Sequence, residues 1–175
     1  PLADRLQALE ELLHANQGHP MRTRYAGLGE TSIMVNGALR QALDPANGGD
    51  IATTFPGEPL AAQLRMIARL VKVSQGPAIG HKRQIFYAGL GGFDTHDNQM
   101  DPTRHAALLS QVAGALAAFR AALQEIGMLD RVTTFTMSDF GRTLNSNGNG
   151  TDHGSQAPMF VIGGSVVGGV YGNHP

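Results

Sequence analysis

The feature that most restricts the fold of this chain is a change of hydrophobic period near residue 84. Before residue 76, apolar residues recur every three or four positions, which is the spacing of helices. After it, the chain alternates a short apolar run at 84–88, a long helical pattern, a β-branched run at 132–137 and an apolar run at 158–162. Strand, long helix and strand in this order form a βαβ unit. The sequence therefore predicts an α/β fold with a parallel-rich sheet flanked by helices.

Three helices are predicted before the change of period. The first places Leu6, Leu9 and Leu13 on one face. The second is expected over 23–43, and the third is expected to begin at Pro59, since proline suits the first helical turn.

The fourth predicted helix has the clearest amphipathic pattern. Asp101 is expected to cap it, Pro102 to occupy its first position and Gly127 to end it. Its apolar stripe is predicted to face the core and consists of Leu109, Val112, Leu116, Phe119, Leu123 and Ile126.

Composition excludes several classes of function. With 13 Lys+Arg against 14 Asp+Glu, the net charge is -1, so a basic surface for nucleic acid is not expected. The absence of cysteine excludes disulfides, a thiol nucleophile and metal sites with thiolate ligands. No uninterrupted apolar stretch reaches the length of a membrane span. The 175 residues are predicted to form a single domain, 1–175, with a helical part at 1–76 and a motif-bearing α/β part at 82–175.

Three polar motifs follow the predicted strands or lie between them. They are GGFDTH with Asp94 and His96, SDFGRT with Asp139 and Arg142, and GTDHG with Asp152 and His153. Carboxylates and imidazoles gathered in one cleft are common ligands of divalent metals. Asp94 and His96 are two positions apart, so an extended backbone would direct both to one side, where they could share an ion. The motifs thus predict a metal site with zinc or manganese favoured, and calcium or magnesium left open.

Arg142 has a separate expected role. It follows a glycine near a possible helix start, where its guanidinium could hold an oxygen of a phosphate or sulfate, and Thr143 could cap that helix. Each motif also fits a simpler interpretation as a polar turn in which an Asp or Ser bonds its own backbone.

The order and spacing of GGFDTHDNQ, VTTFTMSDFGRTLNSNGNGTDHG and GGSVVGGVYG resemble an uncharacterised bacterial family of twin-arginine-exported proteins. That family is expected to have a sulfatase-like fold of the alkaline-phosphatase superfamily. The clear resemblance covers 85–175. It implies hydrolysis of phosphate or sulfate esters and a periplasmic location.

The resemblance also implies roles for individual residues. Asp94, His96 and His153 resemble the ligands of a first metal, and Asp152 would assist or orient His153. Asp139 resembles a ligand of a second metal, although Phe140 stands where a further histidine is expected. The nucleophile is unknown. Nothing in 1–80 resembles the first strand of that superfamily, so the chain would be an incomplete portion of the fold and inactive alone.

Two functions therefore remain open from the sequence. One is a metal-dependent hydrolase of small phosphate or sulfate esters, and the other is a non-catalytic exported protein for binding or assembly that keeps the hydrolase scaffold. Ligands that converge and remain open would favour the enzyme, whereas metal-free, tightly packed motifs would favour the second. Ligand atoms of one zinc-like ion should approach one another within roughly 3 to 4 Å.

Overall fold

The computed structural model of the protein describes residues 2–15, 18–77, 79–155 and 157–172. The chain divides into two compact units, one made of Pro1–Asp50 with Val73–His81 and one made of Ile51–Lys72 with Lys82–Pro175. All the polar motifs belong to the second unit.

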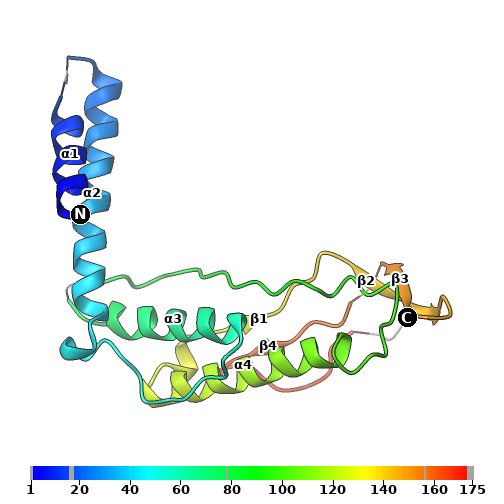
Figure 1. Ribbon diagram of the computed structural model, residues 1–175. Helices are drawn as coiled ribbons and strands as arrows, with labels where there is room; N and C mark the ends of the chain where they lie inside the picture. Colours follow the sequence, from blue (N-terminus) through cyan, green and yellow to red (C-terminus); the bar gives the residue numbers. More distant parts are fainter. Residues whose placement is uncertain (1, 16–17, 78, 156, 173–175) are drawn as a thin grey trace. The chain divides into compact units, whose positions relative to one another are not determined.

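The first unit is built on a pair of helices, α1 (Leu2–His14) and α2 (Pro20–Leu43), followed by a short 3-10 turn, η1 (Pro45–Asn47) (Figure 1). Both helices were predicted. α2 begins a few residues earlier than its hydrophobic pattern indicates, because His19 caps it with its ring Nδ1 and Pro20 takes the first turn. The helices approach closely at Gly29, where an added Cβ would lie 2.8 Å from the Leu13 side chain.

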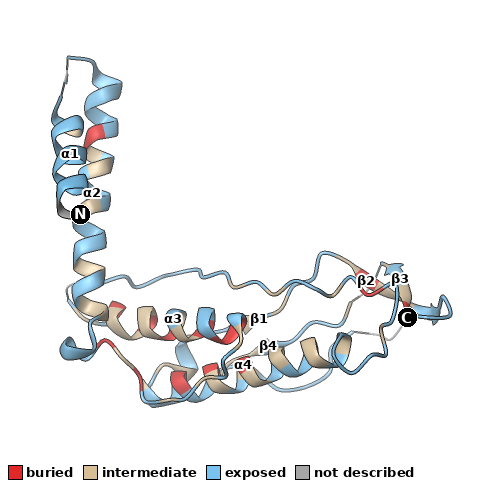
Figure 2. Cartoon of the chain, in the orientation of Figure 1, coloured by how far each residue is buried: buried red, intermediate tan, exposed pale blue. Residues whose placement is uncertain are grey.

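Little apolar surface is buried between α1 and α2. Among the described residues of α2, only Ala26 is buried. Figure 2 shows both helices as mostly exposed. Of the predicted stripe, Leu6 and Leu9 keep 39% and 43% of their surface exposed, and Leu13 is half-buried. The predicted leucine stripe therefore forms a helix but covers no substantial core.

The hydrophobic core lies in the second unit, between α3 (Pro59–Ser74) and α4 (His105–Glu125). α3 begins at Pro59, as predicted. Alanines allow the two helices to approach closely, since Ala61, Ala68 and Ala122 are fully buried. Figure 2 shows buried positions concentrated on α3, α4 and the segment that precedes α3. The buried residues of this core are Ile51, Leu60, Ala61, Leu64, Ala68, Val71, Ala115, Phe119, Ala122 and Leu123.

The beginning of α4 differs from the prediction. The Asp101 carboxylate accepts hydrogen bonds from the backbone N–H and the hydroxyl of Thr103, at 2.8 and 2.7 Å. It closes a local turn instead of capping the helix, and α4 starts at His105, so Pro102 lies outside it.

The end of α4 follows the prediction. Gly127 adopts a left-handed φ of 69°. The N–H groups of Gly127 and Met128 then reach back to the carbonyls of Gln124 and Leu123, at 3.1 and 2.8 Å. A single turn, η2 (Leu129–Arg131), follows. Most of the predicted stripe packs in the core, but Leu109 is 49% exposed.

The predicted parallel-rich sheet is absent from the part of the chain that the structure describes. β1 (Thr134–Phe135) pairs with β4 (Val161–Ile162), and β2 (Gly141–Ser146) pairs with β3 (Thr151–Gly154), both antiparallel. An α/β fold of the alkaline-phosphatase type, complete or partial, is therefore not indicated, and that prediction is wrong. The helical start expected near Thr143 is wrong too, because that residue lies within β2.

The segment 84–88, expected to be a buried strand, has no regular secondary structure and belongs to neither sheet. Ile85 and Tyr87 are 100% and 90% exposed. The segment is held at its end by the Gln63 amide, which accepts from the N–H of Gly89 and donates to its carbonyl, both at 3.0 Å. The prediction of a buried strand at 84–88 is therefore wrong, because β-propensity does not specify a strand partner.

By length and composition alone, α4 meets the requirements of a membrane span, alone among the helices in the described residues. Four residues of α4 are buried in the core: Ala115, Phe119, Ala122 and Leu123. Packing in a protein core therefore also explains why a helix of this length is apolar.

Candidate metal centre

The centre is built on the hairpin of β2 and β3. Its turn contains Gly148, at a φ of 103°, and is closed by the Asn147 side-chain oxygen, which accepts from the N–H of Gly150 at 2.8 Å. Gly150 is buried, and a Cβ there would lie 2.5 Å from the carbonyl oxygens of Thr95 and His96. A glycine is required at this position because the backbone of the 93–99 loop lies directly against it.

Several hydrogen bonds fasten the 93–99 loop to the hairpin. The backbone N–H of Gln99 donates to the carbonyl of Asn149 at 3.2 Å, and the Asn147 amide donates to the carbonyl of His96 at 3.0 Å. The hydroxyl of Thr151 donates to the Gln99 side chain at 2.8 Å. Two segments separated by the whole of α4 are thereby brought side by side.

Arg142 is the main cross-link between loop and hairpin. Its guanidinium donates to the carbonyls of Thr151, at 2.6 Å, and of Phe93, and lies 3.4 Å from the Thr95 hydroxyl. Only 17% of its side chain is exposed, and it lies 3.5 Å from the Asp94 carboxylate. Arg142 was expected to hold substrate oxygen, but in the structure its terminal nitrogens face acceptors of the protein itself.

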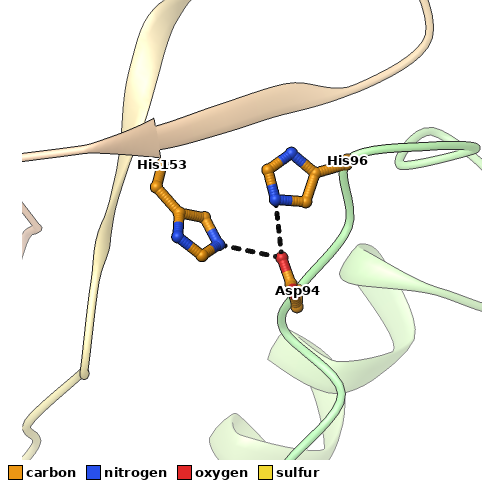
Figure 3. A group of neighbouring side chains, drawn as sticks. All are labelled: Asp94, His96 and His153. Carbon is orange, nitrogen blue, oxygen red and sulfur yellow. Dashed lines mark hydrogen bonds and ion pairs between the residues drawn. The ribbon is translucent and has the colours of Figure 1, made fainter.

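Asp94, His96 and His153 converge on one point (Figure 3). The Nε2 atoms of His153 and His96 lie 2.9 and 3.0 Å from the same oxygen of Asp94. The three potential ligand atoms all lie within 4.8 Å of one another. About half of each side chain is exposed, at 59% for Asp94, 45% for His96 and 48% for His153. The group therefore presents one oxygen and two ring nitrogens at an open surface.

Asp152 lies behind His96 and not among these three atoms. Its carboxylate contacts the second ring nitrogen of His96, Nδ1, at 3.1 Å, and accepts from the Asn147 amide at 3.0 Å. Its backbone N–H donates to the Thr143 hydroxyl at 3.2 Å. Asp152 was predicted within the metal set, with an orienting role as the alternative. The orienting role was expected toward His153, whereas in the structure the Asp152 carboxylate contacts His96.

Both carboxylates favour the ionised form. The hydrogen bond with His153 is the largest cause that lowers the pKa of Asp94 below its ordinary 3.8; desolvation opposes it, and electrostatic attraction from His96, His153 and Arg142 lowers the pKa further. The pKa of Asp152 is lowered chiefly by the Asn147 hydrogen bond and then by His96. Ionised carboxylates are the form that binds metal ions.

The SDFGRT motif contributes differently from the prediction. Asp139 is exposed and does not join the three-residue group. Phe140, noted in the sequence as standing in place of a ligand, stacks on the ring of His153 with centroids 4.0 Å apart and an interplanar angle of 11°. Its ring also lies 5.1 Å from the guanidinium carbon of Arg142.

Sequence reasoning missed the roles of two residues at this centre. Asn147, which no predicted motif singled out, contacts both the Asp152 carboxylate and the His96 carbonyl. Phe140 was treated only as a missing ligand. The strand register, which pairs Arg142 with His153, is what places Phe140 beside the imidazole, and no local sequence signal reveals that register.

Comparison with known proteins shows the family of the chain. Residues 62–175 match the family described as "Protein of unknown function (DUF1501)", and the chain belongs to it. No curated protein and no solved structure matches the chain significantly.

Proposed function

We propose that this member of the family is a metal-dependent hydrolase whose centre binds one divalent ion through Asp94, His96 and His153. The observation that carries the proposal is the convergence of two Nε2 atoms on one carboxylate oxygen, at 2.9 and 3.0 Å. Ligand atoms bonded to one ion at about 2.0–2.2 Å lie roughly 3 to 4 Å apart, so little movement would be needed to admit the ion.

The ligand types narrow the choice of metal. Two imidazoles and one carboxylate form a set that suits zinc and also manganese, whereas calcium and magnesium prefer sites made of oxygen alone. Zinc is therefore the first ion to test. Asp152 fits the same proposal, because metal-binding histidines usually donate their second N–H to a carboxylate.

Three protein ligands leave room for a fourth position, as in catalytic zinc sites. An ion bound there would supply Lewis acidity and lower the pKa of a water molecule. The residues of the chain would hold the site in shape: Asp152 would orient His96, and Arg142 would keep the Asp94 loop against β3. The proposed substrates, phosphate or sulfate esters, and the proposed periplasmic location come from the sequence resemblance alone.

A second candidate function is a non-catalytic protein for binding or assembly that carries a metal site. It is favoured by the exposure of the centre, because active sites for small molecules are usually concave. A small cavity of the second unit is lined by Leu116, Phe119 and Leu123 among others, and includes none of the three ligands. Hydrolysis that depends on the metal would distinguish the enzyme from this alternative.

Metal binding is tested by titrating the 175-residue chain with Zn²⁺ and Mn²⁺ in a calorimeter. We expect one ion per chain, and we expect His153→Ala to weaken binding by more than the about 10- to 100-fold that loss of an orienting partner costs. His81→Ala removes an exposed histidine outside the group and serves as the matched control. Equal affinity of His153→Ala and the unsubstituted chain would remove His153 from the centre.

Hydrolysis is measured on the protein at its natural length, with phosphate and sulfate monoesters of a chromogenic phenol. We expect turnover that a chelator abolishes, that zinc or manganese restores and that His153→Ala loses. Zinc binding without turnover of either ester would reject the enzyme and leave the binding protein.

A further inference from the structure

The two histidines of the centre are held in different ways. The second nitrogen of His96 contacts the Asp152 carboxylate at 3.1 Å. For His153, within the part of the chain that the structure describes, no hydrogen bond of Nδ1 is recorded, and its ring instead stacks on Phe140 at 4.0 Å and 11°. An imidazole turns readily about its Cβ–Cγ bond, so a ligand without a second contact would not keep Nε2 aimed at Asp94.

Phe140 is itself held in place from several sides. Its carbonyl accepts a hydrogen bond from the Ser138 hydroxyl at 2.8 Å, which fixes the backbone immediately before β2. The next residue, Gly141, is paired with Gly154, the neighbour of His153. The ring lies near the Arg142 guanidinium, whose terminal nitrogens are bonded to carbonyls. The aromatic surface beside His153 is therefore rigid enough to align another ring.

We propose that Phe140 is a positioning residue of the metal centre, and that its ring holds the imidazole of His153 with Nε2 directed at the ion. The inference rests on the metal centre proposed above. Phe140 thus does for His153, by aromatic stacking, what Asp152 does for His96 by hydrogen bonding.

The test compares the Zn²⁺ affinities of the unsubstituted chain, three variants of Phe140 and one control variant, measured by competition with a chromophoric chelator. Phe140→Tyr keeps the flat ring, Phe140→Leu keeps apolar bulk without it, and Phe140→Ala removes both. We expect Phe140→Tyr to bind within about twofold of the unsubstituted chain and the other two to bind about three- to tenfold more weakly, the range that one aromatic pair contributes. Phe135→Ala removes a 63% exposed aromatic from β1 and is the matched control.

Thermal melting of each chain without metal separates positioning from folding. If Phe140→Ala does not fold, Phe140→Leu decides the question. Equal zinc affinities for the Leu variant and the unsubstituted chain would overturn the role of Phe140 and leave the metal centre intact. Failure of the unsubstituted chain to bind zinc would overturn the centre itself, and the role of Phe140 with it.

Discussion

Replacing Arg142 by methionine tests how the 93–99 loop is fixed to the hairpin. The substitution keeps a long apolar side chain but removes the donors that reach the carbonyls of Thr151 and Phe93. Hydrogen bonds from a charged donor contribute about 1.5–3 kcal/mol each. Because 17% of the side chain is exposed, water can partly replace them, and we expect the contact between loop and hairpin to weaken by about 3 kcal/mol.

The assay is amide hydrogen exchange of Gln99, whose N–H crosses from the loop to the carbonyl of Asn149 at 3.2 Å. A loss of about 3 kcal/mol makes opening about a hundredfold more frequent, so exchange at Gln99 should accelerate by that factor or reach the rate of an unstructured chain. Amides in the middle of α4 should exchange as before. Arg131→Met removes an exposed arginine and should leave Gln99 unaffected. Exchange at Gln99 within threefold of the unsubstituted chain would refute the cross-linking role of Arg142.

Two further predictions concern the core of the second unit. Glu125 accepts hydrogen bonds from the Thr53 hydroxyl and from the N–H groups of Ala52 and Thr53, and these lower its pKa below the ordinary 4.5. The stabilising effect of the Glu125 carboxylate is present above pH 4.5 and is lost as the pH falls through its lowered pKa. Urea unfolding at several pH values should therefore show that the free energy of unfolding falls at acid pH, and that Glu125→Gln reduces this fall. Identical pH profiles for the two chains would contradict this. Phe119 is 4% exposed, so Phe119→Ala should lower the free energy of unfolding by about 3–5 kcal/mol. Leu109 is 49% exposed, and Leu109→Ala should lower it by less than about 1 kcal/mol in urea unfolding. Similar losses for both variants would place the core elsewhere.

The helices could be predicted because their signals are local. Apolar spacing located all four, Pro59 marked the start of α3, and Gly127 marked the end of α4. The prediction that Asp101 caps α4 was wrong because an aspartate can close a turn as readily as it caps a helix. The position of Thr103 decides between the turn and the cap.

The sheet could not be predicted because strand pairing is set by contacts between distant residues. The runs at 132–137 and 158–162 do contain strands, but β1 and β4 pair antiparallel over two residues each. The run at 84–88 has the composition of a buried strand and finds no place in either sheet. The βαβ interpretation assumed that strands flanking a helix pair with each other, which is a tendency and not a requirement.

The structure brings three of the five predicted metal ligands together, although the predicted fold was wrong. Asp94, His96 and His153 were expected to meet at the edge of a parallel sheet, but a glycine-rich hairpin and a polar loop bring them together. Asp139 and Asp152 were predicted in the same set and lie outside the group, and metal binding stays a prediction. The roles of Phe140 and Arg142 depend on the register of β2 and β3, which the sequence does not reveal.

The placement of the candidate ligands along the chain would link binding of the proposed metal to folding. His96 and His153 stand on either side of the segment 97–152, which contains the whole of α4. An ion joining them would close this segment into a ring even in the unfolded chain, and a permanent cross-link closing a loop of that length removes conformational entropy equivalent to about 4 kcal/mol. Binding of an ion at this exposed surface would therefore change the stability of the packing of α4. The metal-loaded and metal-free forms would differ in how readily α4 separates from α3.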